Sequence, residues 1–141
     1  MTTKPNPAPS LPVHHLAARV YYDDTDAGGV VYHANYLRFA ERGRCEFLRS
    51  LGYDNNWMHK EFGLLLVARH VEIDYRASAV LDDLLDISTE IAEIGNSSMK
   101  VKHVVSCKDK VLAEIIITLV AVSGIGKASR IPPQLRQIFG R

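Results

Sequence analysis

The sequence is poor in cysteine, in long apolar runs and in net charge, and each shortage excludes a class of protein. The two cysteines, Cys45 and Cys107, lie far apart and form no CxxC pair, which argues against a disulfide scaffold and predicts reduced thiols in a cytoplasmic protein. The longest strongly apolar run, Ile115 to Val122, is much shorter than the ~20 residues that span a bilayer. A net charge of +1 lacks the basic excess typical of proteins that bind nucleic acids or anionic membranes. We therefore expect no nucleic-acid partner and no integral membrane segment.

Several common catalytic signatures are missing as well. The chain has no GxSxG and no HExxH, and the GIGK run at residues 124–127 lacks the spacing of a phosphate-binding P-loop. The six histidines show no ligand spacing in the sequence, so we predict no metal. The adjacent pair His14 and His15 is interpreted as part of a tail.

The length and the composition are typical of one globular domain. The chain has 141 residues, of which 47% are hydrophobic and 23% are charged. Four prolines fall within the first fifteen residues, which contain no apolar segment of the kind that signal peptides carry. We predict a disordered, proline-rich tail at residues 1–15 and a single domain at residues 16–141.

The stretch RVYYDDTDAGGVVYHANYLRFAERGRCEFLRSL, residues 19–51, is predicted to form a strand, a polar loop and a long helix. Alternating side chains indicate the strand at residues 19–23, and a 3.6-residue apolar repeat indicates the helix at residues 34–51. Gly52 should end the helix. Gly43 costs ~1 kcal/mol relative to alanine, so we interpret it as a place where another backbone passes close to the helix. The loop between strand and helix carries Asp23, Asp24, Asp26, Gly28 and Gly29.

From residue 62 the apolar repeat changes to a period of two, which indicates strands. Val67, Val71, Ile73 and Tyr75 are expected on one face of the first of them. The connections are too short for crossover helices, so the sheet should be antiparallel and the class α+β. The last strand is apolar on nearly every position while a single helix covers one face, so we expect a second copy of the chain on the other. The four strands are predicted at residues 62–76, 85–91, 98–107 and 111–122, before a short helix that opens at Pro132 and Pro133.

Asp26, His33 and the start of the predicted helix form the candidate site. The first N–H groups of a helix lack intrahelical partners and carry a partial positive charge, which can polarise a carbonyl and stabilise an oxyanion. Asp26 can attack such a carbonyl or deprotonate a water molecule, and His33 can orient the substrate, bond the water or steady the carboxylate. The aspartates equally suit a structural role as caps of turns and of the helix. The residues by themselves leave both roles open.

The run YYDDTDAGGVVYHANYLRFAERGR strongly resembles the hot-dog-fold acyl-CoA thioesterases of the 4-hydroxybenzoyl-CoA thioesterase superfamily, most closely the Tol-Pal-associated, YbgC-like branch. The resemblance continues through VEIDYRASAVLDDLL and RIPPQL. It implies an α+β hot-dog fold, in which a five-stranded antiparallel sheet wraps one long central helix. It also implies that Asp26 is the catalytic carboxylate and that His33 lies at the active site. Family members form dimers, often dimers of dimers, so a homodimer or homotetramer is implied.

The implied activity is hydrolysis of an acyl-CoA thioester to a carboxylic acid and free coenzyme A. No separate cofactor is expected, because coenzyme A is part of the substrate. A local basic cluster should receive its phosphates, although each cation in question also suits a plain solvated surface position. Glu41 is a candidate second carboxylate, or simply part of a charged helix face. The candidate substrate-binding residues are Tyr32, Lys100, Lys102, Lys127 and Arg130.

Two other functions are weighed against this one. A hydratase or dehydratase acting on acyl thioesters would need an acid and base pair aimed at the acyl chain, and the DTDAGG segment argues against it. A non-catalytic module that binds an acyl thioester, or serves as a scaffold, would bind the ligand without releasing thiol.

Overall fold

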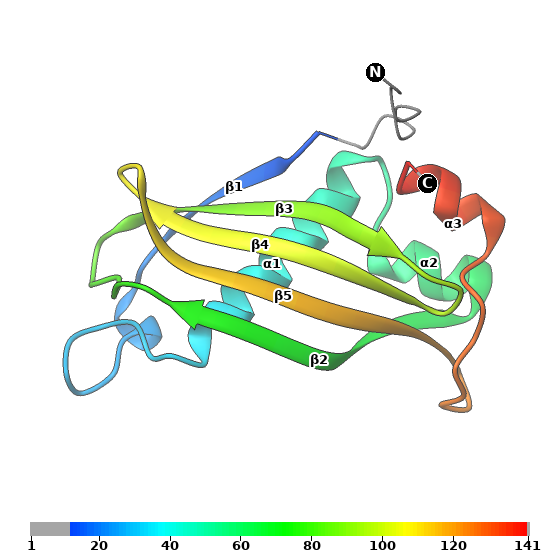
Figure 1. Ribbon diagram of the computed structural model, residues 1–141, viewed down its shortest axis with the longest axis horizontal. Helices are drawn as coiled ribbons and strands as arrows, with labels where there is room; N and C mark the ends of the chain where they lie inside the picture. The colour runs from blue at the N-terminus through cyan, green and yellow to red at the C-terminus, as the bar shows by residue number, and fades with distance from the viewer. Residues whose placement is uncertain (1–11, 141) are drawn as a thin grey trace, which may run out of the picture.

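The computed structural model describes residues 12–140, in which one long helix lies against a five-stranded antiparallel sheet. The strand order β1-β3-β4-β5-β2 places β1 and β2 at the two edges of the sheet (Figure 1). This is the hot-dog arrangement that the resemblance implies, and the α+β prediction is confirmed. None of the helices in residues 12–140 combines the length and the apolar character that a membrane-spanning helix needs. The elements are β1 (His14–Arg19), α1 (Asn35–Ser50), α2 (Asn55–Phe62), β2 (Leu64–Tyr75), β3 (Leu84–Ile94), β4 (Ser98–Cys107), β5 (Lys110–Ser123) and α3 (Pro133–Ile138).

The central helix α1 confirms the predicted 34–51 helix and packs its apolar stripe onto the inner face of the sheet (Figure 1). Gly43 lies in this stripe, but side chains approach it, not a passing backbone. A β-carbon there would lie 2.8 Å from Thr89 Oγ1 and 3.0 Å from Ile87 Cγ2, both on β3. The glycine therefore lets the helix sit close to the sheet. Gly52, with φ +91°, follows the end of the helix as predicted. The buried members of the stripe include Tyr36, Phe39, Ala40 and Phe47.

The first strand begins earlier than the alternation predicted. β1 spans His14–Arg19 and pairs with β3, whereas Tyr22–Asp24 form a short 3-10 helix. Asp24 Oδ2 accepts a hydrogen bond from the Tyr21 N–H at 2.8 Å, which stabilises a turn where a strand was expected. The two histidines that we assigned to a tail are therefore part of the sheet. Residues 1–11 of that predicted tail lie outside the described residues.

The edge strand β2 confirms the predicted 62–76 strand, but a register shift between Ala68 and His70 breaks the expected two-residue repeat. Val67 pairs with Val120 on the outer face, whereas Val71 pairs with Ile117 on the face that carries α1. The expectation that Val67 and Val71 share a face was therefore wrong, because a bulge inserts one extra residue between them.

The strand β5, next to β2, is buried mainly on one side in this single chain. Ile115, Ile117 and Leu119 are at most 4% exposed and face α1, while Ile116 on the outer face is 36% exposed. β3 and β4 confirm the predicted strands. The remaining helices close one end of the sheet: α2 is capped by Asp54, and α3 opens at Pro133 as predicted.

Candidate active site

The loop before α1 holds Asp26 in a tight turn. Asp26 Oδ1 accepts a hydrogen bond from the Gly28 N–H at 2.8 Å, and the backbone of Asp26 bonds to Val30 and Gly29. A β-carbon at Gly28 would lie 3.2 Å from that carboxylate oxygen, and Gly29 takes a φ of +83°. The two glycines therefore let the loop fold back over its own carboxylate.

The turn is tied to the rest of the fold from two sides. The Val31 N–H donates to the Ala79 carbonyl at 2.9 Å, and Val30 forms an isolated bridge with Val80. On the other side, Asn35 Nδ2 donates to the Asp24 carbonyl at 2.8 Å. These bonds bring the loop to the N-terminus of α1.

The start of α1 has the electrostatic character expected of it. Ala34 is the N-cap, and no side chain of the described residues caps the helix there. A helix N-terminus carries roughly half a positive charge and a set of N–H groups without intrahelical partners. The Asn35 N–H donates to the Tyr32 carbonyl at 2.8 Å and the Leu37 N–H to the Ala34 carbonyl at 3.2 Å. The remaining N–H groups of this first turn can receive a carbonyl or an oxyanion.

His33 lies beside this helix start and is held by β2. The Tyr75 hydroxyl, at the end of β2, donates to the His33 carbonyl oxygen at 2.7 Å. The rings of His33 and Tyr75 meet edge to face at 6.5 Å, and the Tyr36 ring lies 5.5 Å from that of Tyr75. Desolvation by burial, and then the neighbouring Tyr36, raise the pKa of the Tyr75 hydroxyl, so it remains a donor at neutral pH.

Asp26 and His33 line the same groove, a hollow of about 340 Å³ at the start of α1. Tyr36, Tyr75 and Arg76 contribute to its walls. The groove is polar because it combines a carboxylate, an imidazole, two phenols and a guanidinium. The structure therefore brings together the two residues that we predicted to be catalytic, and it adds the end of β2 to them.

Arg76 is the most strongly bonded of the wall residues. Its guanidinium forms ion pairs with Asp74 at 3.1 Å and with Glu114 at 2.7 Å. These two carboxylates hold the side chain in place and offset its charge. Arg76 is accordingly a structural wall of the groove.

Tyr36, Tyr75 and Arg76 were missed in the sequence analysis. Tyr36 belongs to the first turn of α1, whereas Tyr75 and Arg76 reach the groove because β2 ends beside the loop. The tyrosine at the polar end of a strand, in IDYR, was the one available signal.

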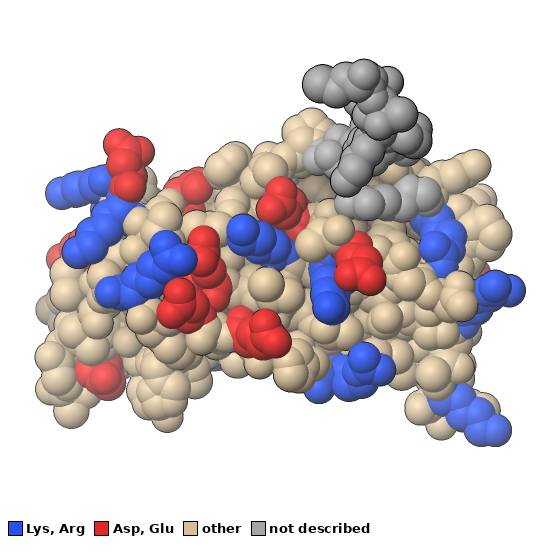
Figure 2. Space-filling model, viewed as in Figure 1, with Lys and Arg blue, Asp and Glu red and all other residues tan. Residues whose placement is uncertain are grey.

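The predicted substrate-binding residues fall in three places, of which only the first is near the groove. Tyr32 is 45% exposed and its ring lies 4.5 Å from that of His33. Lys100 and Lys102 lie on β4 and alternate with the buried Met99 and Val101, so they are on the face away from α1. That face interleaves positive and negative side chains (Figure 2).

Lys127 and Arg130 follow β5 at the far end of the sheet. β2 pairs Leu64 with Ser123 at that end and Tyr75 with Ala113 at the groove end. Eleven residues of strand separate the two ends, which is roughly 35 Å. Within one chain, these two cations are therefore remote from Asp26.

The comparisons with known proteins agree on a family. The model of the thioesterase-like superfamily matches residues 20–139. The acyl-CoA thioesterase YbgC of Haemophilus influenzae is 38% identical over 122 residues, which cover 86% of this chain and 90% of that protein. The acyl-CoA thioester hydrolase YbgC of Escherichia coli O157:H7 is 39% identical over 82% of this chain and 87% of that protein. The crystal structure of a probable thioesterase from Bartonella henselae is 36% identical and superposes with a TM-score of 0.82, covering 86% of this chain and 100% of that one.

Proposed function

The chain belongs to the thioesterase-like superfamily, and we propose that it hydrolyses acyl-CoA thioesters to a carboxylic acid and free coenzyme A. The observation that carries the proposal is the shared groove at the start of α1, which is lined by both Asp26 and His33. A thioester carbonyl at the positive end of a helix is activated toward attack, and a carboxylate beside it supplies the attacking group.

Two routes are compatible with this arrangement. In the first, Asp26 takes a proton from water, the water oxygen attacks the carbonyl carbon, and the helix start stabilises the resulting oxyanion. The C–S bond then breaks, and the departing thiolate takes the proton from Asp26. In the second, an Asp26 oxygen attacks the carbonyl, the thiolate leaves, and water hydrolyses the acyl-aspartate anhydride. His33 orients the thioester or the water in either route.

Oxygen-18 tests the covalent route. Single turnover in labelled water, followed by mass analysis of the enzyme, retains label in Asp26 only if the anhydride forms and water attacks its aspartyl carbonyl. Label found in the released acid alone is expected from direct attack by water and also from attack of water on the acyl carbonyl of the anhydride, so the informative outcome is label retained in Asp26.

We further propose that the active form is a homodimer, or a dimer of dimers, that pairs through β2. In the described residues β2 is the last strand of the sheet order, so one of its edges has no neighbouring strand. Exposed apolar side chains follow it, including Leu65 at 44%, Val67 at 42% and Val71 at 37%. An open, apolar edge of this length favours pairing with an identical strand.

This pairing predicts where the phosphates of coenzyme A bind. If two β2 strands align antiparallel about a two-fold axis, the Leu64 end of one chain lies beside the Tyr75 end of the other. Lys127 and Arg130 of the second copy then approach the groove that they cannot reach within their own chain. We propose that they bind the phosphates of coenzyme A there.

Replacing Val71 by aspartate tests this assembly. A new charge on this edge strand in both copies should separate them, and light scattering coupled to gel filtration should then give the mass of one chain. Thioesterase activity should fall when the copies separate. A wild-type protein that is active as a monomer would refute the dimer proposal.

A thiol-trapping assay with short, long and aromatic acyl-CoAs tests the activity itself. Release of free coenzyme A above the uncatalysed rate supports the hydrolase. A module that only binds acyl thioesters would show binding without thiol, and a hydratase or dehydratase would change the acyl chain with the thioester intact.

A further inference from the structure

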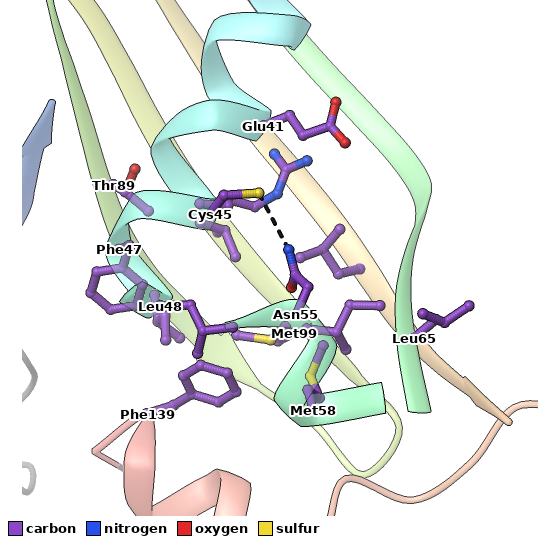
Figure 3. Close-up of a pocket in the computed structure, with 15 residues that line it drawn as sticks. Glu41, Cys45, Phe47, Leu48, Asn55, Met58, Leu65, Thr89, Met99 and Phe139 are labelled. Carbon is purple, nitrogen blue, oxygen red and sulfur yellow. Dashed lines mark hydrogen bonds between the residues drawn. The ribbon is translucent and has the colours of Figure 1, made fainter. Parts of the chain in front are cut away.

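A second cavity, of about 260 Å³, lies between α1, α2 and the inner face of the sheet, with α3 at its end (Figure 3). Within the described residues it shares no wall residue with the Asp26 groove. Its size lies just below the usual range of ligand pockets, about 300 to 1,000 Å³, so it suits a small ligand. Most of its wall is apolar, including Phe47, Leu48, Met58, Met99, Leu119 and Phe139.

One cation, Arg44 of α1, stands in this apolar wall. Its guanidinium forms a hydrogen bond with His103 of β4, at 3.3 Å between Arg44 Nη1 and His103 Nε2. Among residues 12–140 no carboxylate forms an ion pair with Arg44. Desolvation by burial lowers the pKa of the guanidinium, and the nearby charge of Glu41 partly offsets this. Arginine nevertheless remains charged at neutral pH.

His103 does not balance that charge. A guanidinium only donates hydrogen bonds, so His103 Nε2 must accept, and Nδ1 carries the proton and donates toward the Ser88 carbonyl and Thr89 Oγ1 at 3.2 and 3.1 Å. Burial, together with the Arg44 charge, lowers the pKa of His103 to about 3, so the ring is neutral. The cavity therefore contains a desolvated positive charge whose counter-charge is not supplied by a direct contact.

We propose that this cavity binds a medium-chain alkanoate, with the carboxylate on Arg44 and the aliphatic chain against the apolar wall. A planar guanidinium matches a carboxylate in shape and charge, and the wall matches an unbranched chain. A fully polar anion would leave the wall uncovered, and a neutral lipid would leave the cation unpaired. The proposal goes beyond the thioesterase activity and does not depend on Asp26.

Glu41 and Cys45 mark the mouth and the wall of this cavity. In Figure 3, Glu41 extends from α1 on the same side as Cys45, whose Sγ accepts a hydrogen bond from Asn55 Nδ2 at 3.3 Å. The Glu41 carboxylate should compete with a bound alkanoate for Arg44. The Cys45 thiol should lose access to solvent when the cavity fills.

Titration calorimetry with octanoate and with octan-1-ol measures the role of the charge. The wild-type protein should bind octanoate more tightly, and Arg44→Gln should weaken octanoate binding at least tenfold, which corresponds to about 1.4 kcal/mol, while octan-1-ol binding is kept. Arg42→Gln is the matched control, because Arg42 is on the same helix but stacks on Phe39 and lines a different groove. Glu41→Gln should strengthen octanoate binding and leave octan-1-ol unchanged.

Alkylation by iodoacetamide tests where octanoate binds. Octanoate should protect Cys45 and leave Cys107, the other free thiol, as reactive as before. If Arg44→Gln fails to fold, Arg44→Lys should keep the preference for octanoate, and the Glu41→Gln result still applies. Equal affinity for acid and alcohol in the wild type, or no protection of Cys45, would overturn the proposal.

Discussion

Asp26→Asn removes the charge of the proposed acting carboxylate while keeping its shape. The only side-chain hydrogen bond of Asp26 among the described residues is the one that Oδ1 accepts from the Gly28 N–H at 2.8 Å. An asparagine oxygen accepts the same bond, and the side chain is exposed. We therefore expect the free energy of unfolding to change by no more than about 0.5 kcal/mol, as for other surface substitutions.

The effect on the reaction should be much larger. An amide neither accepts the proton of water at neutral pH nor attacks a thioester, and a positioned general base contributes about 10²- to 10⁴-fold. At about 1.36 kcal/mol per tenfold, the loss in kcat/KM corresponds to roughly 3 to 5 kcal/mol of transition-state stabilisation. Thiol release from acyl-CoA and urea denaturation measure the two effects on the same samples.

Asp23→Asn is the matched control for this variant. Asp23 lies in the same loop and has the same chemistry, but it borders a different groove, together with Arg19 and Arg42. Its activity should remain close to that of the wild type. If Asp26→Asn kept its activity and instead lost stability, the carboxylate would be a turn cap and the proposed reaction would be refuted.

Three further variants test particular contacts. Gly43→Ala places a β-carbon 2.8 Å from Thr89 Oγ1, so the cost of overpacking, about 1 to 3 kcal/mol, should exceed the gain of ~1 kcal/mol in helix propensity and lower the urea midpoint. Tyr75→Phe loses the hydrogen bond to the His33 carbonyl and should reduce kcat/KM about tenfold while the protein stays folded, as steady-state kinetics and circular dichroism would show. Burial lowers the pKa of His103 to about 3, below its unfolded value of about 6.5, so its contribution to stability is present above pH 6.5 and is lost as the pH falls toward 3. His103→Asn should therefore show a shallower loss of unfolding free energy between pH 6.5 and 4, by up to about 1.4 kcal/mol per pH unit.

The hydrophobic repeat predicted secondary structure correctly wherever one face of an element is buried and the other is not. Tyr36, Ala40 and Phe47 repeat with the helical period because α1 buries one stripe, and the predicted helix is confirmed within a residue at each end. It misled us at residues 19–23, where the carboxylate of Asp24 satisfies a backbone N–H and stabilises a turn. A local side-chain bond of this kind leaves no trace in an alternating pattern.

The bulge in β2 also made a prediction from hydrophobic periodicity wrong. Val67 and Val71 are four residues apart, which in an unbroken strand places them on one face. The register shift between Ala68 and His70 moves them to opposite faces, and only pairing with β5 determines where that extra residue lies. Gly43 was correctly identified as a point of close approach, but whether backbone or side chains approach it depends on the neighbouring strand.

The amino-acid sequence by itself determined the order and type of most elements and the segment that holds Asp26 and His33, because hydrophobic period and loop chemistry are local properties of the chain. Tertiary structure alone decided that Tyr75 reaches His33 across the groove, that Lys127 and Arg130 lie at the far end of the sheet, and that Arg44 stands in an apolar cavity. These are relations between segments distant along the chain, and they arise only when an antiparallel sheet packs against its helix.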